Sequence, residues 1–337
     1  MTDYFRPLAQ TGDARPADAI PLAGTGSWFT HVEHLTRGGT AGILPVKDTP
    51  ETWRERVSQD RAPIEGLDFS QPVIMGILNV TPDSFSDGGQ FNSGSQALRR
   101  AQVMVDAGAH LLDVGGESTR PGALEVPFEA EIARTVPVIE AIRRKLDVPL
   151  SIDTRKARVA HAALEAGANI VNDVSGFAFD PDLGPFCATR AAPVCLMHAQ
   201  GLPETMQVKP QYDDVLLDVY DFLEQQIELA LSLGLCREQI IVDPGLGFGK
   251  TQAHNLALIR GLSLFHGLGC PVLLGASRKG LIRDIGQAPA AQDRAPGSIA
   301  VALAAVVQGV QILRVHDVAE TRQALALWQA STTGVRT

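Results

Sequence analysis

The chain has 337 residues, of which 45% are hydrophobic and 20% are charged, a composition typical of a soluble globular protein with a large core. Its formal net charge of −9 argues against a nucleic-acid partner. No basic region precedes an apolar run near the N-terminus, and Gln308 and Gly309 interrupt the longest apolar segment. We therefore expect no signal peptide, no membrane partner and a cytoplasmic location. The four cysteines lack metal-ligand spacing, which favours buried thiols.

Residues 1–70 do not share the regular pattern of the rest of the chain. They contain two of the three tryptophans, Trp28 and Trp53, and one plausible helix at 49–58. Disordered tails are poor in bulky aromatic residues. We expect a small folded N-terminal addition that packs against a main domain formed by residues 71–337, and no motif indicates its role.

From residue 72 onward, short apolar runs alternate with segments of helical periodicity. The apolar runs occupy residues 73–78, 111–114, 149–152, 169–172, 193–197, 239–242, 271–274 and 311–315. The helical segments are 96–107, 128–146, 158–166, 213–233 and 297–307, with weaker candidates after the fourth and sixth runs. This alternation predicts parallel strands covered by helices. Eight units over about 265 residues favour an α/β fold of the (β/α)8 TIM-barrel type over a doubly wound open sheet.

Every one of these runs ends in polar residues. In chain order they are Asn79, Asp113 with Glu117, Asp153, Asn172 with Asp173, His198, Asp243, Ser277 with Lys279, and Arg314 with His316. A polar residue after a single strand is ordinary because loops contact water. In a barrel, however, all these side chains gather at the C-terminal end of the strands, where active sites of this fold lie. The set as a whole therefore predicts an active site.

Two loops follow the first two strands. The first, "NVTPDSFSDGG" (79–89), carries Phe85, which either covers a flat ligand or packs back onto the barrel. The second, "DVGGESTRPGA" (113–123), offers hydroxyls and the guanidinium of Arg120, which suit a phosphate or a carboxylate.

The middle strands lead to "SIDTRK" and "VDPGLGFGK". Asp153 either pairs with Arg155 or accepts hydrogen bonds from a ligand. The glycine-rich turn around Phe248 lacks the spacing of a Walker loop and suits a flat ligand.

The last two strands lead to "GASRKG" and "RVHD". Many barrels bind phosphate at the loops after strands seven and eight. Lys279, Arg314 and His316, with Arg278 beside them, therefore predict a site for a phosphate-type anion. A Schiff-base role for Lys279 is an alternative. Carboxylates and amides suit a heterocycle with several N–H donors, so we predict that a second substrate displaces pyrophosphate from such a heterocycle.

These motifs, together with "NDVSG", "LMHAQGLPETMQ" and "ILRVHDV", resemble the dihydropteroate synthase family of pterin-binding TIM-barrel enzymes, over residues 72–330. The resemblance implies a transferase of folate biosynthesis. Such an enzyme joins 6-hydroxymethyl-7,8-dihydropterin pyrophosphate to 4-aminobenzoate, uses Mg²⁺, forms a homodimer and is a target of sulfonamides. It also implies a dissociative reaction, in which pyrophosphate leaves before the aniline nitrogen attacks.

The resemblance also implies roles for individual residues. It implies that Asp153, Lys279 and Asp87 are catalytic. The pterin would be held by Asp153, Asn172, Met197, Asp243, Phe248, Gly275 and Lys279. The pyrophosphate would be held by Asn79, Arg120, Arg314 and His316, with Asn79 also placing the metal. The aminobenzoate and its flap would involve Phe85, Thr119, Pro121, Ser277 and Gly280, and Arg120 would contribute to this site as well.

Gly280 departs from the family pattern, since Ser or a larger residue often follows "SRK". If that side chain normally contacts the aminobenzoate carboxylate, only the backbone N–H is left here. Two alternatives to the synthase are a pterin-binding methyltransferase and a non-catalytic relative. The segment "PGSIAVALAAVV" is apolar nearly all round, which predicts a homodimer built on the late helices.

Overall fold

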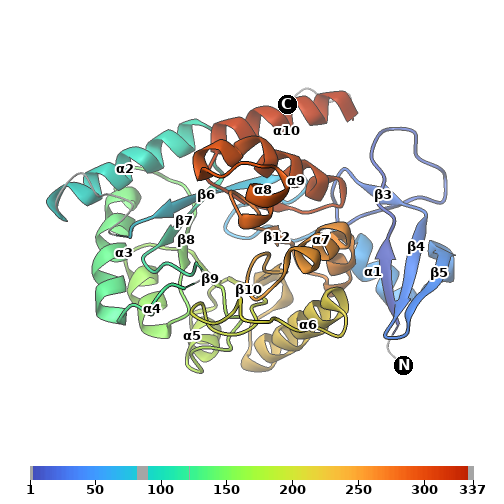
Figure 1. Cartoon of the computed structure of the whole chain (residues 1–337), viewed down its shortest axis with the longest axis horizontal. Coiled ribbons are helices and arrows are strands. Elements are labelled where there is room, and N and C mark those ends of the chain that lie inside the picture. The colour runs from blue at the N-terminus through green and yellow to red at the C-terminus, as the bar shows by residue number, and fades with distance from the viewer. Residues whose placement is uncertain (1–2, 82–89, 121, 333–337) are drawn as a thin grey trace.

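A closed barrel forms the centre of the molecule. A computed structural model describes residues 3–81, 90–120 and 122–332, and within these ranges eight parallel strands pair in the order β11-β10-β9-β8-β7-β6-β13-β12. The strands are β6 (Val73–Asn79), β7 (Leu111–Gly115), β8 (Leu150–Asp153), β9 (Ile170–Asp173), β10 (Val194–Met197), β11 (Ile240–Asp243), β12 (Leu273–Leu274) and β13 (Ile312–Val315). A parallel bridge between Val242 and Val272 joins the two ends of the sheet. The (β/α)8 barrel is confirmed and the open sheet is wrong (Figure 1).

The barrel interior is filled with apolar side chains. The inward-facing cluster contains Met75, Leu111, Ile170, Cys195, Ile241, Leu273 and Ile312. Ile64, Leu67 and Phe69, from the segment before β6, pack against the same cluster. Because the interior is packed, substrates must bind at an end of the barrel rather than within it. Of the four cysteines three are buried and Cys236 is exposed, so the expectation of buried thiols was wrong for Cys236.

Helices cover the outside of the barrel (Figure 1). They are α2 (Gln90–Asp106), α3 (Phe128–Arg143), α4 (Ala157–Glu165), α5 (Leu183–Arg190), α6 (Val215–Leu233), α7 (Gln252–Arg260), α8 (Gly280–Ile285), α9 (Ala295–Val307) and α10 (Val318–Thr332). The Asp214 side chain caps α6 by accepting from the N–H groups of Leu216 and Leu217 at 2.9 and 3.2 Å. No helix in the described ranges combines the length and the apolar character needed to cross a membrane.

The first residues form a small antiparallel unit beside the barrel. Its elements are β1 (Tyr4–Pro7), β2 (Ile20–Pro21), β3 (Trp28–Phe29), β4 (His31–Thr36), β5 (Gly39–Pro45) and α1 (Glu51–Ser58). Tyr4 donates to Asp221 on α6 at 2.9 Å, and the buried Ser263 hydroxyl donates to the Pro7 carbonyl at 2.7 Å. The unit therefore lies against α6 and against the 3-10 helix η4 (Leu262–Leu268). Figure 1 shows it beside the barrel. A domain boundary at residue 70 stays a prediction.

Candidate active site

The expected site residues lie at the C-terminal ends of the barrel strands. Asn79, Asp153, Asn172, Met197 and Asp243 stand at the ends of β6, β8, β9, β10 and β11. Gly275, Ser277, Lys279 and Gly280 follow β12, Arg314 lies in β13, and His316 follows it. Thr119 and Arg120 lie in the loop after β7, whereas Phe85, Asp87 and Pro121 fall outside the described residues.

Arg314 is the centre of a buried ion cluster. Its Nε donates to Oδ2 of Asp113 at 2.6 Å, and its Nη2 donates to Oδ2 of Asp153 at 2.7 Å. The Asn172 amide also donates to Oδ2 of Asp113, at 3.2 Å. Arg314, assigned above to the pyrophosphate, thus also binds a carboxylate assigned to the pterin, so the two halves of the site are electrostatically coupled.

Asp113 was one of the expected strand-end residues, but no role in the site was assigned to it. Its side chain is completely buried, and Oδ1 has no hydrogen-bond partner among the described residues. A buried carboxylate oxygen without a partner is costly. The signal in the sequence was an acid inside an otherwise apolar strand, but only the closed barrel shows that this acid faces Arg314.

Desolvation shifts the ionisation of the cluster toward neutral pH. Burial raises the pKa of Asp153 to about 7, although Arg314 opposes the shift. Desolvation lowers the pKa of Lys279 to about 8, although the Asp243 carboxylate opposes it. The pKa of Asp243 itself is raised, chiefly by burial. Ionisable groups with such shifted pKa values in one cleft are typical of active sites.

Lys279 and Phe248 form one wall of the barrel mouth. The Lys279 ammonium donates to the Leu246 carbonyl and lies 4.7 Å from the centroid of the Phe248 ring. Gly247 has a φ of +83°, and a Cβ there would lie 3.3 Å from Cδ of Lys279. Gly275 likewise leaves space beside Asp243 and Arg314, with the nearest atoms at 3.8 and 3.9 Å from an added Cβ. The glycines thus leave a narrow slot between charged side chains.

The neighbouring cations Arg278 and Lys279 point to different partners. Arg278 has a φ of +58°, and its Nε donates to Oδ2 of Asp317 at 3.0 Å. Its charge is therefore paired outside the cluster. The Ser277 hydroxyl oxygen lies within hydrogen-bond distance of Nδ1 of His316, at 3.1 Å. Burial lowers the pKa of His316 to about 3. His316 is therefore neutral at physiological pH, so among Lys279, Arg314 and His316 only the first two carry positive charge.

The proposed pairing of Asp153 with Arg155 is wrong. Arg155 instead donates to Oε1 of Glu117 at 3.1 Å and stacks on the Phe179 ring at 3.9 Å. Asp173 likewise turns away from the mouth, since its carboxylate accepts from the backbone N–H groups of Ser175 and Phe177 at 2.8 and 2.6 Å. Glu117 and Asp173 therefore organise loops, although Glu117 follows β7 and Asp173 is the last residue of β9.

A buried lysine of the loop after β11 was also not assigned to the site. Lys250 is 3% exposed, and its Nζ lies 2.8 Å from Nδ1 of His198 and 3.1 Å from the Phe248 carbonyl. Burial lowers the pKa of His198, which keeps its imidazole neutral and able to accept this hydrogen bond. Lys250 thus fixes the loop that carries Phe248 to the end of β10.

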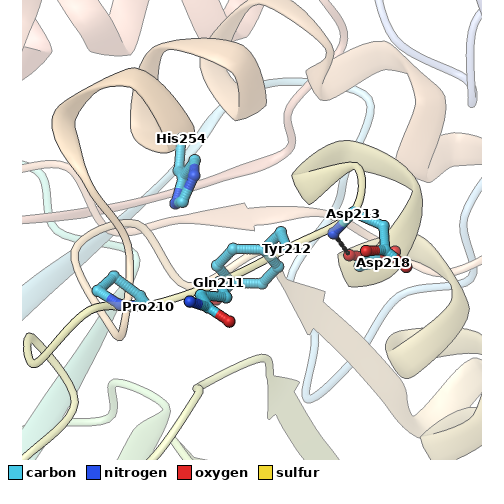
Figure 2. A pocket seen from close by; sticks show the side chains of 6 residues that line it. All are labelled: Pro210, Gln211, Tyr212, Asp213, Asp218 and His254. Carbon is cyan, nitrogen blue, oxygen red and sulfur yellow. Dashed lines mark hydrogen bonds between the residues drawn. The ribbon is translucent and has the colours of Figure 1, made fainter.

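Two cavities open near these loops. One of about 240 Å³ is lined by Thr119, Arg155, Phe179, Met206, Phe248 and further residues of the same loops, and it adjoins the Lys279 wall. A shallower one of about 530 Å³ lies away from the ion cluster and is lined by Pro210, Gln211, Tyr212, Asp213, Asp218 and His254 (Figure 2). Tyr212 and His254 meet edge to face there at 4.9 Å. The smaller cavity is therefore the better candidate for substrate binding.

Gly280 lies at the first position of α8 with space around it. The nearest heavy atom to an added Cβ would be Nη2 of Arg283, at 3.7 Å. Steric crowding therefore does not explain the absence of a side chain at this position.

Residues 75–316 match the family described as pterin binding enzyme. The chain belongs to this family. It is 47% identical over 290 residues to the dihydropteroate synthase of Synechocystis, covering 85% of this chain and 95% of that protein. It is 46% identical over 265 residues to the dihydropteroate synthase of Escherichia coli, covering 79% of this chain and 93% of the relative.

Solved structures agree with the family assignment. The Yersinia pestis dihydropteroate synthase, solved with a sulfonamide drug, superposes with a TM-score of 0.75 at 47% identity, covering 79% of this chain and 96% of that one. The Xanthomonas albilineans enzyme, solved with 4-aminobenzoic acid, has a TM-score of 0.75 at 43% identity. The match covers 79% of this chain and 94% of that one. Another structure of that enzyme contains 7,8-dihydropteroate. The assignment of single residues to single substrates stays a prediction.

Proposed function

We propose that the chain is a dihydropteroate synthase. It condenses 6-hydroxymethyl-7,8-dihydropterin pyrophosphate with 4-aminobenzoate and releases 7,8-dihydropteroate and pyrophosphate. The observation that carries this proposal is the buried cluster of carboxylates and an amide around Arg314, beside Lys279. Relatives at 46–47% identity with this name, over most of both chains, support it.

The acidic and amide side chains suit the pterin ring. Asp153, Asn172 and Asp243 are at most 7% exposed, and together they offer acceptors and a donor to a heterocycle with several N–H groups. Phe248 and Met197 supply apolar surface for the flat ring. Because the acceptors are desolvated, their hydrogen bonds to the ring discriminate strongly against ligands without matching donors.

The cations suit the pyrophosphate. Arg314 donates from Nε to Asp113 and from Nη2 to Asp153. Because a guanidinium carries five N–H donors, the remaining N–H groups can donate to an oxygen of the leaving pyrophosphate. Lys279 adds a second positive charge. Neutral His316 contributes a hydrogen bond rather than a charge.

The reaction is dissociative in this proposal. Departure of pyrophosphate leaves a resonance-stabilised pterin cation, which the weakly nucleophilic aniline nitrogen then attacks. Ionised Asp153 stabilises that cation from a site with little water, where charge interactions are strong. Thr119 and Arg120 approach the amine substrate from the loop after β7.

We propose that a magnesium ion binds at this site together with the substrate pyrophosphate. The described residues contain no group of three or more His, Cys, Asp or Glu side chains that could hold a metal alone. Magnesium commonly binds one or two protein ligands plus substrate phosphates. Asn79, at the end of β6, would supply a protein oxygen, and the ion would neutralise charge on the leaving pyrophosphate.

The direct test measures pyrophosphate release from the pterin substrate with and without 4-aminobenzoate. For a dihydropteroate synthase, pyrophosphate release should depend on 4-aminobenzoate, and dihydropteroate should form. A pterin-binding methyltransferase or a non-catalytic relative would release none. Borohydride reduction with the pterin substrate examines the Schiff-base alternative, which requires a covalent adduct at Lys279.

We also propose a cytoplasmic homodimer. The segment behind this expectation forms α9, whose Ile299, Val301, Leu303 and Val307 are partly exposed. Ile285 of α8 and Leu327 of α10, at 51% and 68%, add exposed apolar surface on the late helices and support an interface there. Light scattering at micromolar concentration should give twice the chain mass, and Leu327→Glu should lower it. A monomeric mass for the unmodified protein would contradict the dimer.

A further inference from the structure

The loop between β7 and α3 is closed at its base by two buried side chains. It carries Thr119 and Arg120, leaves the barrel at Glu117 and returns at Val126. Oε1 of Glu117 accepts the backbone N–H of Val126 at 3.0 Å, and Nζ of Lys156 donates to the Val126 carbonyl at 2.6 Å. Lys156 also donates to Oε2 of Glu117 at 2.9 Å. Both ends of the loop are thus tied to one ion pair.

This ion pair belongs to a larger buried network. Lys156 donates to Glu131 on α3 at 2.8 Å, and Arg155 donates to Glu117 at 3.1 Å. The side chains of these four residues are 0–8% exposed. Two cations and two carboxylates balance in charge, and removal of one partner leaves an uncompensated buried charge. The network therefore tolerates little displacement of the loop base.

The network also reaches the smaller cavity. Arg155 and Thr119 line the same space of about 240 Å³, and Phe179, beneath the Arg155 guanidinium at 3.9 Å, lines it too. Gly122 further ties the loop to the opposite rim by donating to the Pro203 carbonyl at 2.9 Å. A shift of the loop base would move one wall of this cavity relative to Phe248.

We propose that Glu117 and Lys156 are positioning residues that hold the Thr119–Arg120 loop in place for the amine substrate. This rests on the proposed function, in which that loop approaches 4-aminobenzoate. Neither residue is among those that line the cavity of about 240 Å³. In the proposed function the pterin is held by Asp153, Asn172 and Asp243. Their side chains hydrogen-bond to Arg314, Asp113 and the Gly245 N–H rather than to Glu117 or Lys156, so the two substrates should respond differently to loss of the loop base.

The test compares Lys156→Met with a matched control, Arg143→Met. Arg143 makes a similar set of bonds to the Gly167 carbonyl and the Asn169 side chain, at 2.7–3.0 Å, but these residues precede β9 at the other end of the barrel. Lys156→Met should raise the KM for 4-aminobenzoate roughly tenfold, as expected for a displaced binding group. Pterin-pyrophosphate binding, measured by calorimetry, should stay near wild type. Arg143→Met should lower the melting temperature but leave both the KM for 4-aminobenzoate and pterin-pyrophosphate binding near wild type.

A second readout needs no substrate. Backbone amide hydrogen exchange over residues 117–126 should accelerate in Lys156→Met and in the nearly isosteric Glu117→Gln, but not in Arg143→Met. The proposal would be overturned if amide exchange over residues 117–126 were unchanged in a folded Glu117→Gln protein. It would also be overturned if Lys156→Met weakened the binding of pterin pyrophosphate and of 4-aminobenzoate equally. If the wild-type chain released no pyrophosphate, the proposed function would fail while the exchange comparison would still decide whether the loop is held in this way.

Discussion

At the scale of single residues, the coupling of Arg314 to Asp153 decides how the site should respond to mutation. The guanidinium is shared between Asp113 and Asp153 at 2.6 and 2.7 Å, so it cannot be removed without affecting both carboxylates. Arg314 also opposes the burial that raises the pKa of Asp153. A variant at 314 should therefore change anion affinity and pH dependence together.

Arg314→Ala should weaken pyrophosphate binding by roughly 1.5–3 kcal/mol, the range for a hydrogen bond to a charged group. Loss of the guanidinium should also raise the pKa of Asp153 above about 7, so the acidic limb of kcat/KM should move to higher pH. Calorimetry with pyrophosphate and a pH profile measure both effects. Arg190→Ala, which breaks the exposed pair with Glu165, is the control and should change neither. Intact pyrophosphate binding in Arg314→Ala would refute the assignment.

Asp153→Asn should lower kcat more than it lowers pyrophosphate affinity. The amide keeps one acceptor but loses the charge that stabilises the cationic intermediate. In the wild type, kcat should fall as the pH drops through about 7 because Asp153 becomes protonated. This limb should be missing from the variant, since an amide does not titrate there. If Asp153→Asn kept full turnover, or if its kcat still fell as the pH dropped through about 7, the group that titrates in this range would be another residue.

At the scale of elements, the active-site loops depend on single buried side chains. The loop after β7 relies on Glu117 and Lys156, and the loop after β11 relies on Lys250. Loops carry their own polar backbone groups, which must be satisfied when they are not exposed to water. A buried lysine with three donors can satisfy several such groups at once.

Lys250→Met should destabilise the protein and weaken pterin binding. The change leaves Nδ1 of His198 and the Phe248 carbonyl without their donor, which should lower the free energy of unfolding by roughly 1–3 kcal/mol. Urea unfolding measures that loss, and calorimetry measures the pterin affinity. Because the proposed function places Phe248 against the pterin ring, the KM for 4-aminobenzoate should change less. Normal pterin affinity in a destabilised variant would show that Lys250 supports the fold alone.

At the scale of the whole molecule, the N-terminal unit and the barrel share buried contacts. The unit has its own small cluster around Phe29, Val32 and Val57, yet Arg61 reaches the carbonyl of buried His266 at 3.0 Å. Five core side chains are few for an independently stable domain. The unit should therefore unfold together with the barrel.

The tryptophans allow this cooperativity to be measured. Trp28 and Trp53 lie in the N-terminal unit, and Trp328 lies in α10. In Trp328→Phe, fluorescence reports on the N-terminal unit, whereas far-ultraviolet circular dichroism reports mainly on the barrel. Both signals should follow one transition in urea. An earlier transition in fluorescence would mean that the N-terminal unit is a separate domain.

The order and type of most elements were determined by the sequence itself. Strands buried on both faces read as continuous apolar runs, and amphipathic helices carry a 3.6-residue period, so both signals are local. Helices α8 and α10 were not expected. Helix α8 is short. The buried face of α10 contains Val318, Thr321 and Leu325 at i, i+3 and i+7, but Thr321 interrupts its apolar pattern and the apolar Leu327 is exposed, which obscures the helical period in the sequence.

The sequence also determined which residues gather at the barrel mouth, because each lies at a strand end and parallel strands end on the same side. Their partners were decided only by the tertiary structure. Arg155 is two residues from Asp153 in the chain, yet it pairs with Glu117, while Asp153 pairs with Arg314 from β13. Closure of the sheet brings β13 beside β6 and within reach of β7 and β8. Ion pairing follows distance and burial in space, and no local pattern along the chain encodes either.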